Sequence, residues 1–128
     1  SMVKDFNNEN PQSRDQLGLQ TALRILEKWS VNREDQARIL GIDPEILGIP
    51  ESSEQLESSQ LEAVSFLLNI HASLREIFEN PENQYGYMKY VNHNPPFYGR
   101  TPLDFILSGE PSGLKEVFYH LERLKYGQ

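Results

Sequence analysis

The side chains that most often carry out acid–base or metal chemistry are sparse in this sequence. The histidines are His71, His93 and His120, and imidazole both titrates near neutral pH and binds metal ions. No two of them have metal-ligand spacing beside a carboxylate, and the chain has no glycine-rich phosphate loop and no nucleophilic serine elbow. The absence of cysteine excludes thiol catalysis, disulfides and thiolate zinc sites. We therefore expect no enzymatic activity, no cofactor and no metal.

Aromatic residues beside two prolines offer binding chemistry instead. Five rings crowd into one short stretch: Tyr85, Tyr87, Tyr90, Phe97 and Tyr98. Aromatic side chains with a polar edge are favoured anchors at protein interfaces. Pro95 and Pro96 would stiffen the loop before binding and reduce the entropy lost on association. Arg100 and Lys125 would meet carboxylates of a partner, Arg100 through two hydrogen bonds.

Some of these residues also suit a purely structural role. Phe97 and Leu103 lie near the start of a predicted helix, where an apolar residue usually packs as a staple, and we favour that role for both. Gly99 suits a turn. Tyr98, Arg100 and Tyr126 are the residues of this region that we expect at the surface.

The elements that position these residues are predicted to be helices. Apolar residues recur at intervals of three and four, and no segment sustains a period of two. We predict an all-α fold, with a short helix-turn-helix-like unit over residues 17–58 and a compact helical bundle over residues 59–128. Residues 1–16 are polar or aperiodic and predict a flexible tail, with order beginning near Leu17.

Capping residues divide the N-terminal unit into short helices. Asn32 is a predicted N-cap, and Gly41 would end that helix in the left-handed conformation. Asp43 and Pro44 suit the cap and first residue of a third, very short helix.

Similar signals set the helices of the bundle. Ser59 and Glu62 have the spacing of a capping box at the start of a long helix, which ends before Asn80-Pro81. A further helix is predicted through about Val91. Thr101-Pro102 then caps another helix, and the last one runs from about Ser112.

The N-terminal unit raises the possibility of DNA binding. In a helix-turn-helix the helix after the turn reads base edges in the major groove, but here it would be Pro44-Glu45-Ile46-Leu47, which offers no Arg, Lys, Asn or Gln. The polar residues best placed for DNA are Asn32, Arg33 and Arg38. The net charge of −7 and the absence of Lys and Arg at positions 39–74 oppose phosphate binding.

A family resemblance rests on the order of the C-terminal motifs. The run Asn94-Pro95-Pro96-Phe97-Tyr98-Gly99-Arg100-Thr101-Pro102-Leu103, followed by Ile106 and Gly109, resembles the signature of the toxin-binding C-terminal domain of Xre/MbcA/ParS antitoxins. The terminal Leu121-Glu122-Arg123-Leu124-Lys125-Tyr126-Gly127 is similar to the closing pattern of that domain, and residues 19–49 are similar to the Xre-like helix-turn-helix that precedes it.

The resemblance implies an antitoxin of a type II toxin–antitoxin pair. Members of the family bind a RES-domain toxin that degrades NAD in the bacterial cytoplasm, and they cover its active-site cleft. The resemblance places toxin binding on Asn94, Pro95, Pro96, Phe97, Tyr98, Gly99, Arg100, Lys125 and Tyr126. Two alternatives stay open: a DNA-binding operon repressor, which would act as a homodimer, and an orphan interaction scaffold of the same fold.

The expected location of the protein follows from its hydropathy. No run approaches the roughly 18 apolar residues of a membrane span. The N-terminus also lacks the basic and apolar pattern of a secretory signal. We expect a soluble, cytoplasmic protein.

Overall fold

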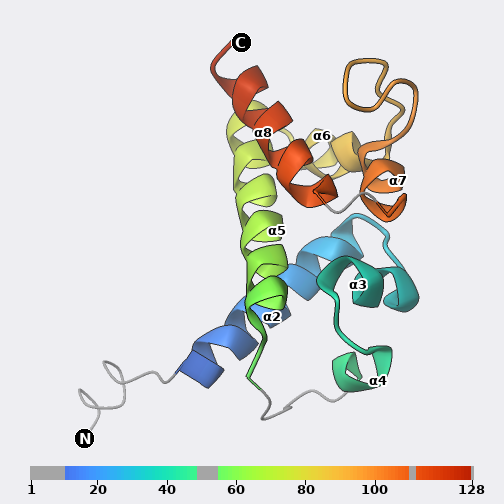
Figure 1. Cartoon of the computed structure of the whole chain (residues 1–128). Coiled ribbons are helices and arrows are strands. Elements are labelled where there is room, and N and C mark those ends of the chain that lie inside the picture. The colour runs from blue at the N-terminus through green and yellow to red at the C-terminus, as the bar shows by residue number, and fades with distance from the viewer. Residues whose placement is uncertain (1–10, 49–54, 110–111, 128) are drawn as a thin grey trace, which may run out of the picture.

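The computed structural model describes residues 11–48, 55–109 and 112–127. The helices are α2 (Pro11–Lys28), α3 (Arg33–Leu40), α4 (Pro44–Leu47), α5 (Ser58–Ile77), α6 (Pro81–Gly86), η1 (Tyr87–Lys89, a 3-10 helix), α7 (Pro102–Leu107) and α8 (Gly113–Lys125). These ranges contain no β-strand, only an isolated antiparallel bridge between Asn92 and Arg100. The predicted all-α fold class is confirmed (Figure 1).

Helix α5 is the central element, and α2, α3, α6 and α8 pack against it (Figure 1). Helix α2 crosses its first half, where Gly18 lies close to the side chain of Val64. Helix α8 packs along its second half, where the Ser73 hydroxyl donates a hydrogen bond to the Glu122 carboxylate at 2.9 Å. One long helix therefore connects the N-terminal helices with the C-terminal ones.

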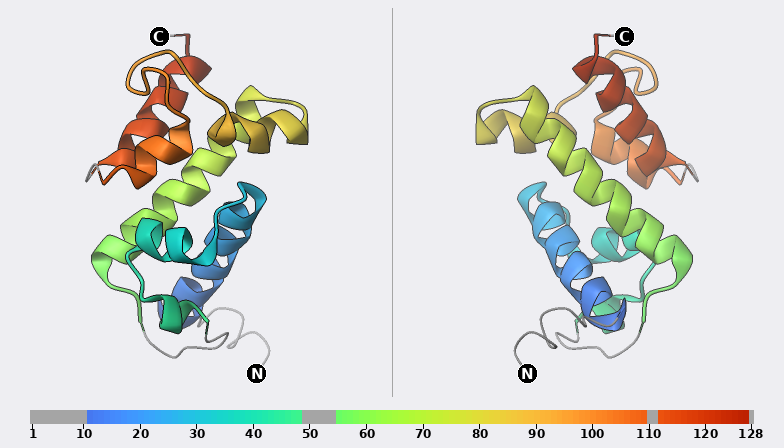
Figure 2. Two further views of the ribbon diagram at one scale, coloured as in Figure 1. Left: turned by 90° about the vertical axis from the view of Figure 1, so that its right-hand side faces the viewer. Right: turned by 90° about the vertical axis from the view of Figure 1, so that its left-hand side faces the viewer.

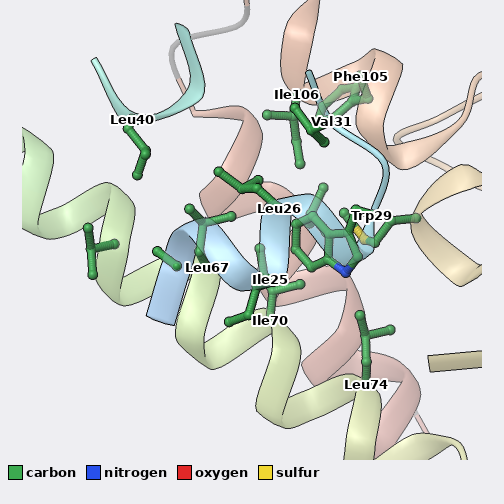
Figure 3. Close-up of a cluster of buried hydrophobic side chains, with 14 of the residues drawn as sticks. Ile25, Leu26, Trp29, Val31, Leu40, Leu67, Ile70, Leu74, Phe105 and Ile106 are labelled. Atoms are coloured by element: carbon green, nitrogen blue, oxygen red, sulfur yellow. The ribbon is translucent and has the colours of Figure 1, made fainter. Parts of the chain in front are cut away.

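A single hydrophobic core runs through both parts of the chain. Trp29 at the end of α2 has no exposed surface, and it lies beside α5 among apolar side chains (Figure 3). The labelled side chains come from both sides of position 58: Ile25, Leu26, Trp29, Val31, Leu40, Leu67, Ile70, Leu74, Phe105 and Ile106. The boundary predicted at residues 58 and 59 therefore does not separate two independent cores.

The predicted caps of the N-terminal unit are confirmed. The Asn32 side chain accepts a hydrogen bond from the Asp35 N–H at 2.8 Å. Gly41 has φ 67°, a left-handed conformation that costs little only for glycine, and its N–H donates to the Ala37 carbonyl. Asp43 caps the Glu45 N–H at 2.9 Å. These local hydrogen bonds explain why the chain turns where the sequence predicted.

Three predicted boundaries are corrected. Helix α2 begins at Pro11 and not near Leu17, so residues 11–16 are helical; the remainder of the predicted tail, residues 1–10, lies outside the described residues. The Asp15 carboxylate accepts the Leu56 N–H at 3.3 Å, which joins this early turn to the residues before α5. The capping box of α5 uses Glu57 and Gln60 instead of Ser59 and Glu62.

The third correction is the end of the helix that was predicted to reach Val91. Helix α6 gives way to the η1 turn, which ends at Lys89. The Tyr90 ring occupies the space that a Cβ on Gly86 would need, and Asn92 pairs with Arg100. The ring contact and the backbone pairing take residues 90–92 out of the helical path.

No helix in the described ranges is long and apolar enough to cross a membrane.

Candidate functional site

The loop over residues 92–100 (hereafter the 92–100 loop) is closed by backbone hydrogen bonds. The Asn92 N–H donates to the Arg100 carbonyl at 3.0 Å, and the Gly99 N–H donates to the Asn92 carbonyl at 2.8 Å. Within the loop, the Asn94 carbonyl accepts from the N–H groups of Phe97 and Tyr98 at 2.9 and 3.1 Å. The loop is thus a compact turn whose two ends are joined.

Phe97 fixes the loop to the core. Its side chain is fully buried and meets the ring of Phe105 edge-on at 5.5 Å and the His120 ring at 5.1 Å between centroids. The packing role that we favoured for Phe97 is confirmed. Although Phe97 belongs to the predicted toxin-binding set, its ring lies beneath the loop and does not reach the surface.

Tyr98 points the other way, into solvent. Its backbone lies in the left-handed region at φ 48°, which is uncommon for a residue other than glycine, and its side chain is 74% exposed. Gly99 follows at φ 96°, where a Cβ would be strained. Two successive positive φ angles therefore turn the chain so that Phe97 is buried and Tyr98 is exposed.

Arg100 is exposed but held in place. Its guanidinium carbon lies 5.1 Å from the centroid of the Phe105 ring, and its Nε donates to the Phe97 carbonyl at 3.4 Å. A guanidinium stacked on a ring keeps its hydrogen-bonding edge available for a carboxylate. Of the other predicted loop residues, Asn94 and Pro95 are exposed and Pro96 is partly buried.

Lys125 is engaged within the chain. Its ammonium lies 2.8 Å from the Glu76 carboxylate and 2.9 Å from that of Glu122, and its side chain is only 18% exposed. Hydrogen bonds to Glu76 and then Glu122 raise the pKa of Lys125, and the bond from Lys125 lowers the pKa of Glu122. This cation links α8 to α5, whereas the next residue, Tyr126, is 69% exposed.

The loop and the C-terminal end of α8 lie at the same end of the molecule, opposite α4 (Figures 1 and 2). We call this the loop end. The large apolar side chains exposed on it are Tyr98, Leu124 and Tyr126, and Tyr90 and Val91, which directly precede the loop, are exposed as well. The exposure of Val91 was not predicted, because the sequence pattern places this residue at the end of a helix.

His71 and His120 both pack against aromatic rings. His120 is buried, its Nε2 has no hydrogen-bond partner, and burial followed by the charge of Arg123 lowers its pKa. Burial and the charge of Arg75 also lower the pKa of His71, which stacks on the Tyr85 ring at 5.8 Å. No cluster of His, Asp and Glu suited to a metal ion occurs among residues 11–48, 55–109 and 112–127.

The residues predicted to contact DNA are exposed, and each also makes a contact within the protein. Asn32 caps α3, and the Arg33 guanidinium donates to the Leu47 carbonyl at 2.9 Å. Arg38 donates to the Leu107 carbonyl at 2.8 Å and pairs with Asp35 at 3.2 Å. The helix in the recognition position, α4, spans four residues. A backbone carbonyl thus accepts one N–H group of each guanidinium, while both arginines remain exposed.

A hollow of about 640 Å³ lies between the N-terminal unit and the bundle. Arg38 and Leu40 line it from α3, Phe66 from α5, and Leu114 and Lys115 from α8. No residue of the 92–100 loop lines it, so it is separate from the loop end.

Residues 73–127 match the family model described as the antitoxin Xre/MbcA/ParS C-terminal toxin-binding domain. The match begins in the last turns of α5 and includes α6, the 92–100 loop, α7 and α8. It does not extend to α2, α3 or α4. No curated protein matches the chain.

Proposed function

We propose that this protein is an antitoxin that neutralises a toxin protein by binding it through the loop end. The observation that carries the proposal is the match of residues 73–127 to a toxin-binding antitoxin domain, because these residues build the 92–100 loop and α8.

The physical properties of the loop end suit recognition of another protein. Tyr98, Arg100 and Tyr126 are exposed, and tyrosine and arginine are the residue types that most often dominate binding energy at interfaces. The hydrogen bonds of Asn94 and the buried ring of Phe97 order the loop in the free protein. An ordered loop loses less conformational entropy on association than a flexible one does.

The toxin class that we propose is the RES-domain type, which degrades NAD. The resemblance of residues 94–103 to the antitoxin signature supports this choice. In this proposal Tyr98 and Arg100 contact the rim of the toxin's cleft, and the bulk of the loop excludes NAD from it. Lys125 contributes indirectly, because its ion pair with Glu76 holds α8 against α5.

The test is co-expression of the protein with the product of the adjacent gene, followed by affinity purification and measurement of cellular NAD. We expect a stable complex and NAD preserved only when the antitoxin is present. Free toxin that continues to consume NAD in the presence of excess antitoxin would refute the proposal. Complex formation with NAD still consumed would refute the proposed blocking of the cleft.

A further inference from the structure

Asn92 forms hydrogen bonds both within the 92–100 loop and to a residue outside it. Its backbone N–H donates to the Arg100 carbonyl at 3.0 Å, and its carbonyl accepts the Gly99 N–H at 2.8 Å. Its side-chain Oδ1 accepts the Asn94 N–H at 2.9 Å, and its Nδ2 donates to the Tyr87 hydroxyl at 3.2 Å. An asparagine amide supplies an acceptor and a donor in one plane, so a single side chain joins the loop to a residue outside it.

Tyr87 connects this contact to the rest of the fold. Its half-buried ring lies 5.8 Å from the Phe78 ring, which follows the last residue of α5. Burial raises the pKa of Tyr87 to about 12, so its hydroxyl is neutral at physiological pH and accepts the Asn92 amide without a charge. A continuous path of contacts thus runs from α5 through Tyr87 and Asn92 to the loop backbone.

We infer that Asn92 is a positioning residue, which orders the 92–100 loop in the free protein and thereby sets its affinity for the toxin. The inference rests on the proposed function. Asn92 is only partly exposed and acts through other residues: its side chain fixes Asn94, whose carbonyl in turn holds the N–H groups of Phe97 and Tyr98. Without the amide, the loop samples other conformations, and binding must first order it.

The first measurement is amide hydrogen exchange of the free protein, for the wild type, Asn92→Ala and Tyr87→Phe. One hydrogen bond contributes enough that we expect the amides of Tyr98 and Gly99 to exchange about tenfold faster in Asn92→Ala. Tyr87→Phe, which removes only the hydroxyl, should give a smaller increase and keeps the ring against Phe78. Asn69→Ala, at an exposed asparagine on α5, is the matched control and should leave loop exchange unchanged.

The second measurement is the affinity of the same variants for the purified RES-type toxin. We expect Asn92→Ala to bind about tenfold more weakly, and Tyr87→Phe to have no further effect once Asn92 is alanine, because it acts through that side chain. Unchanged loop exchange in Asn92→Ala overturns the inference whatever the toxin does. Faster loop exchange in Asn92→Ala with an unchanged affinity for the toxin would also overturn the inference.

The failure of the proposed function would be visible separately. If the wild-type protein does not bind the toxin, the proposed function fails and the docking role of Asn92 fails with it. The exchange data would still decide whether Asn92 orders the loop. If Asn92→Ala fails to fold, Tyr87→Phe decides: equal exchange and affinity to the wild type would overturn the inference.

Discussion

Neighbouring residues of the 92–100 loop have opposite roles. Phe97 is buried against Phe105 and His120, whereas Tyr98 is mostly in solvent. Arg100 lies between these cases, because its guanidinium covers the Phe105 ring and its polar edge remains exposed. Binding energy at this surface is therefore expected from Tyr98 and Arg100, and loop stability from Phe97.

The first prediction concerns these two exposed side chains. Tyr98→Ala and Arg100→Ala should each weaken toxin binding by about tenfold or more, the size of effect found at interface hot spots. Neither change should alter the helical circular dichroism signal, because neither side chain is buried. Isothermal titration calorimetry measures the affinities. Tyr119→Ala, at an exposed tyrosine outside the loop, is the control; equal losses in all three variants would remove our site assignment.

The second prediction concerns pH and His120. Its pKa in the folded protein is below the ordinary 6.5, so the unfolded chain binds more protons as the pH falls below that value. The contribution of His120 to the free energy of unfolding should therefore be greatest above about pH 6.5 and should decline below it. Urea unfolding at about pH 7.5 and about pH 5.5 measures the difference. His120→Leu should reduce the pH dependence but not abolish it, because the pKa of His71 is also lowered; an unchanged dependence would contradict this account.

Among the elements, α5 contributes most to the core that supports the site. One side of it is fully buried at Leu67, Ile70 and Leu74. Its polar residues bond to α8, with Ser73 donating to Glu122 and Glu76 pairing with Lys125. The 92–100 loop is attached to α7 and α8 through the rings of Phe105 and His120. The geometry of the loop end therefore depends on the packing of α5.

The third prediction tests the core of α5. Leu67→Ala should reduce the free energy of unfolding by about 2–5 kcal/mol, the usual cost of truncating a fully buried leucine. Leu61→Ala, on the same helix but exposed, should cost less than about 1 kcal/mol. Urea unfolding gives both values. Equal costs for the two variants would mean that α5 is not packed as described.

How far the sequence predicts these elements depends on whether the signal is local. The caps at Asn32, Gly41 and Asp43 were predictable, because each uses residues within five positions. The early start of α2 was not, since its link to Leu56 connects positions far apart in the sequence. For the same reason the engagement of Lys125 by Glu76 was missed, whereas the exposure of Tyr98 and Arg100 was predicted.

For the molecule as a whole, the two candidate activities lie at opposite ends. The 92–100 loop and the end of α8 form one end, and α4 lies at the other (Figure 2). Toxin binding at the loop end would leave the N-terminal unit accessible. The whole-chain charge of −7 and the absence of Lys and Arg at positions 39–74 nevertheless disfavour DNA binding at that second end.

The fourth prediction is that the isolated protein does not bind its upstream promoter DNA. Phosphate binding needs clustered cations, whereas the chain has a net charge of −7 and no Lys or Arg at positions 39–74. An electrophoretic mobility shift at about 50 mM salt, a low concentration that favours such binding, should show no complex. A complex specific for that promoter that weakens steeply with added salt would instead support the repressor function.

The central claim is that the toxin docks on the loop end, and a footprint of the complex tests it most directly. Amide hydrogen exchange would be compared between the free protein and its complex with the RES-type toxin. We predict additional protection at residues 90–100 and 124–127, with none in α4. Protection confined to α3 and α4, with exchange of the 92–100 loop unchanged, would contradict the claim.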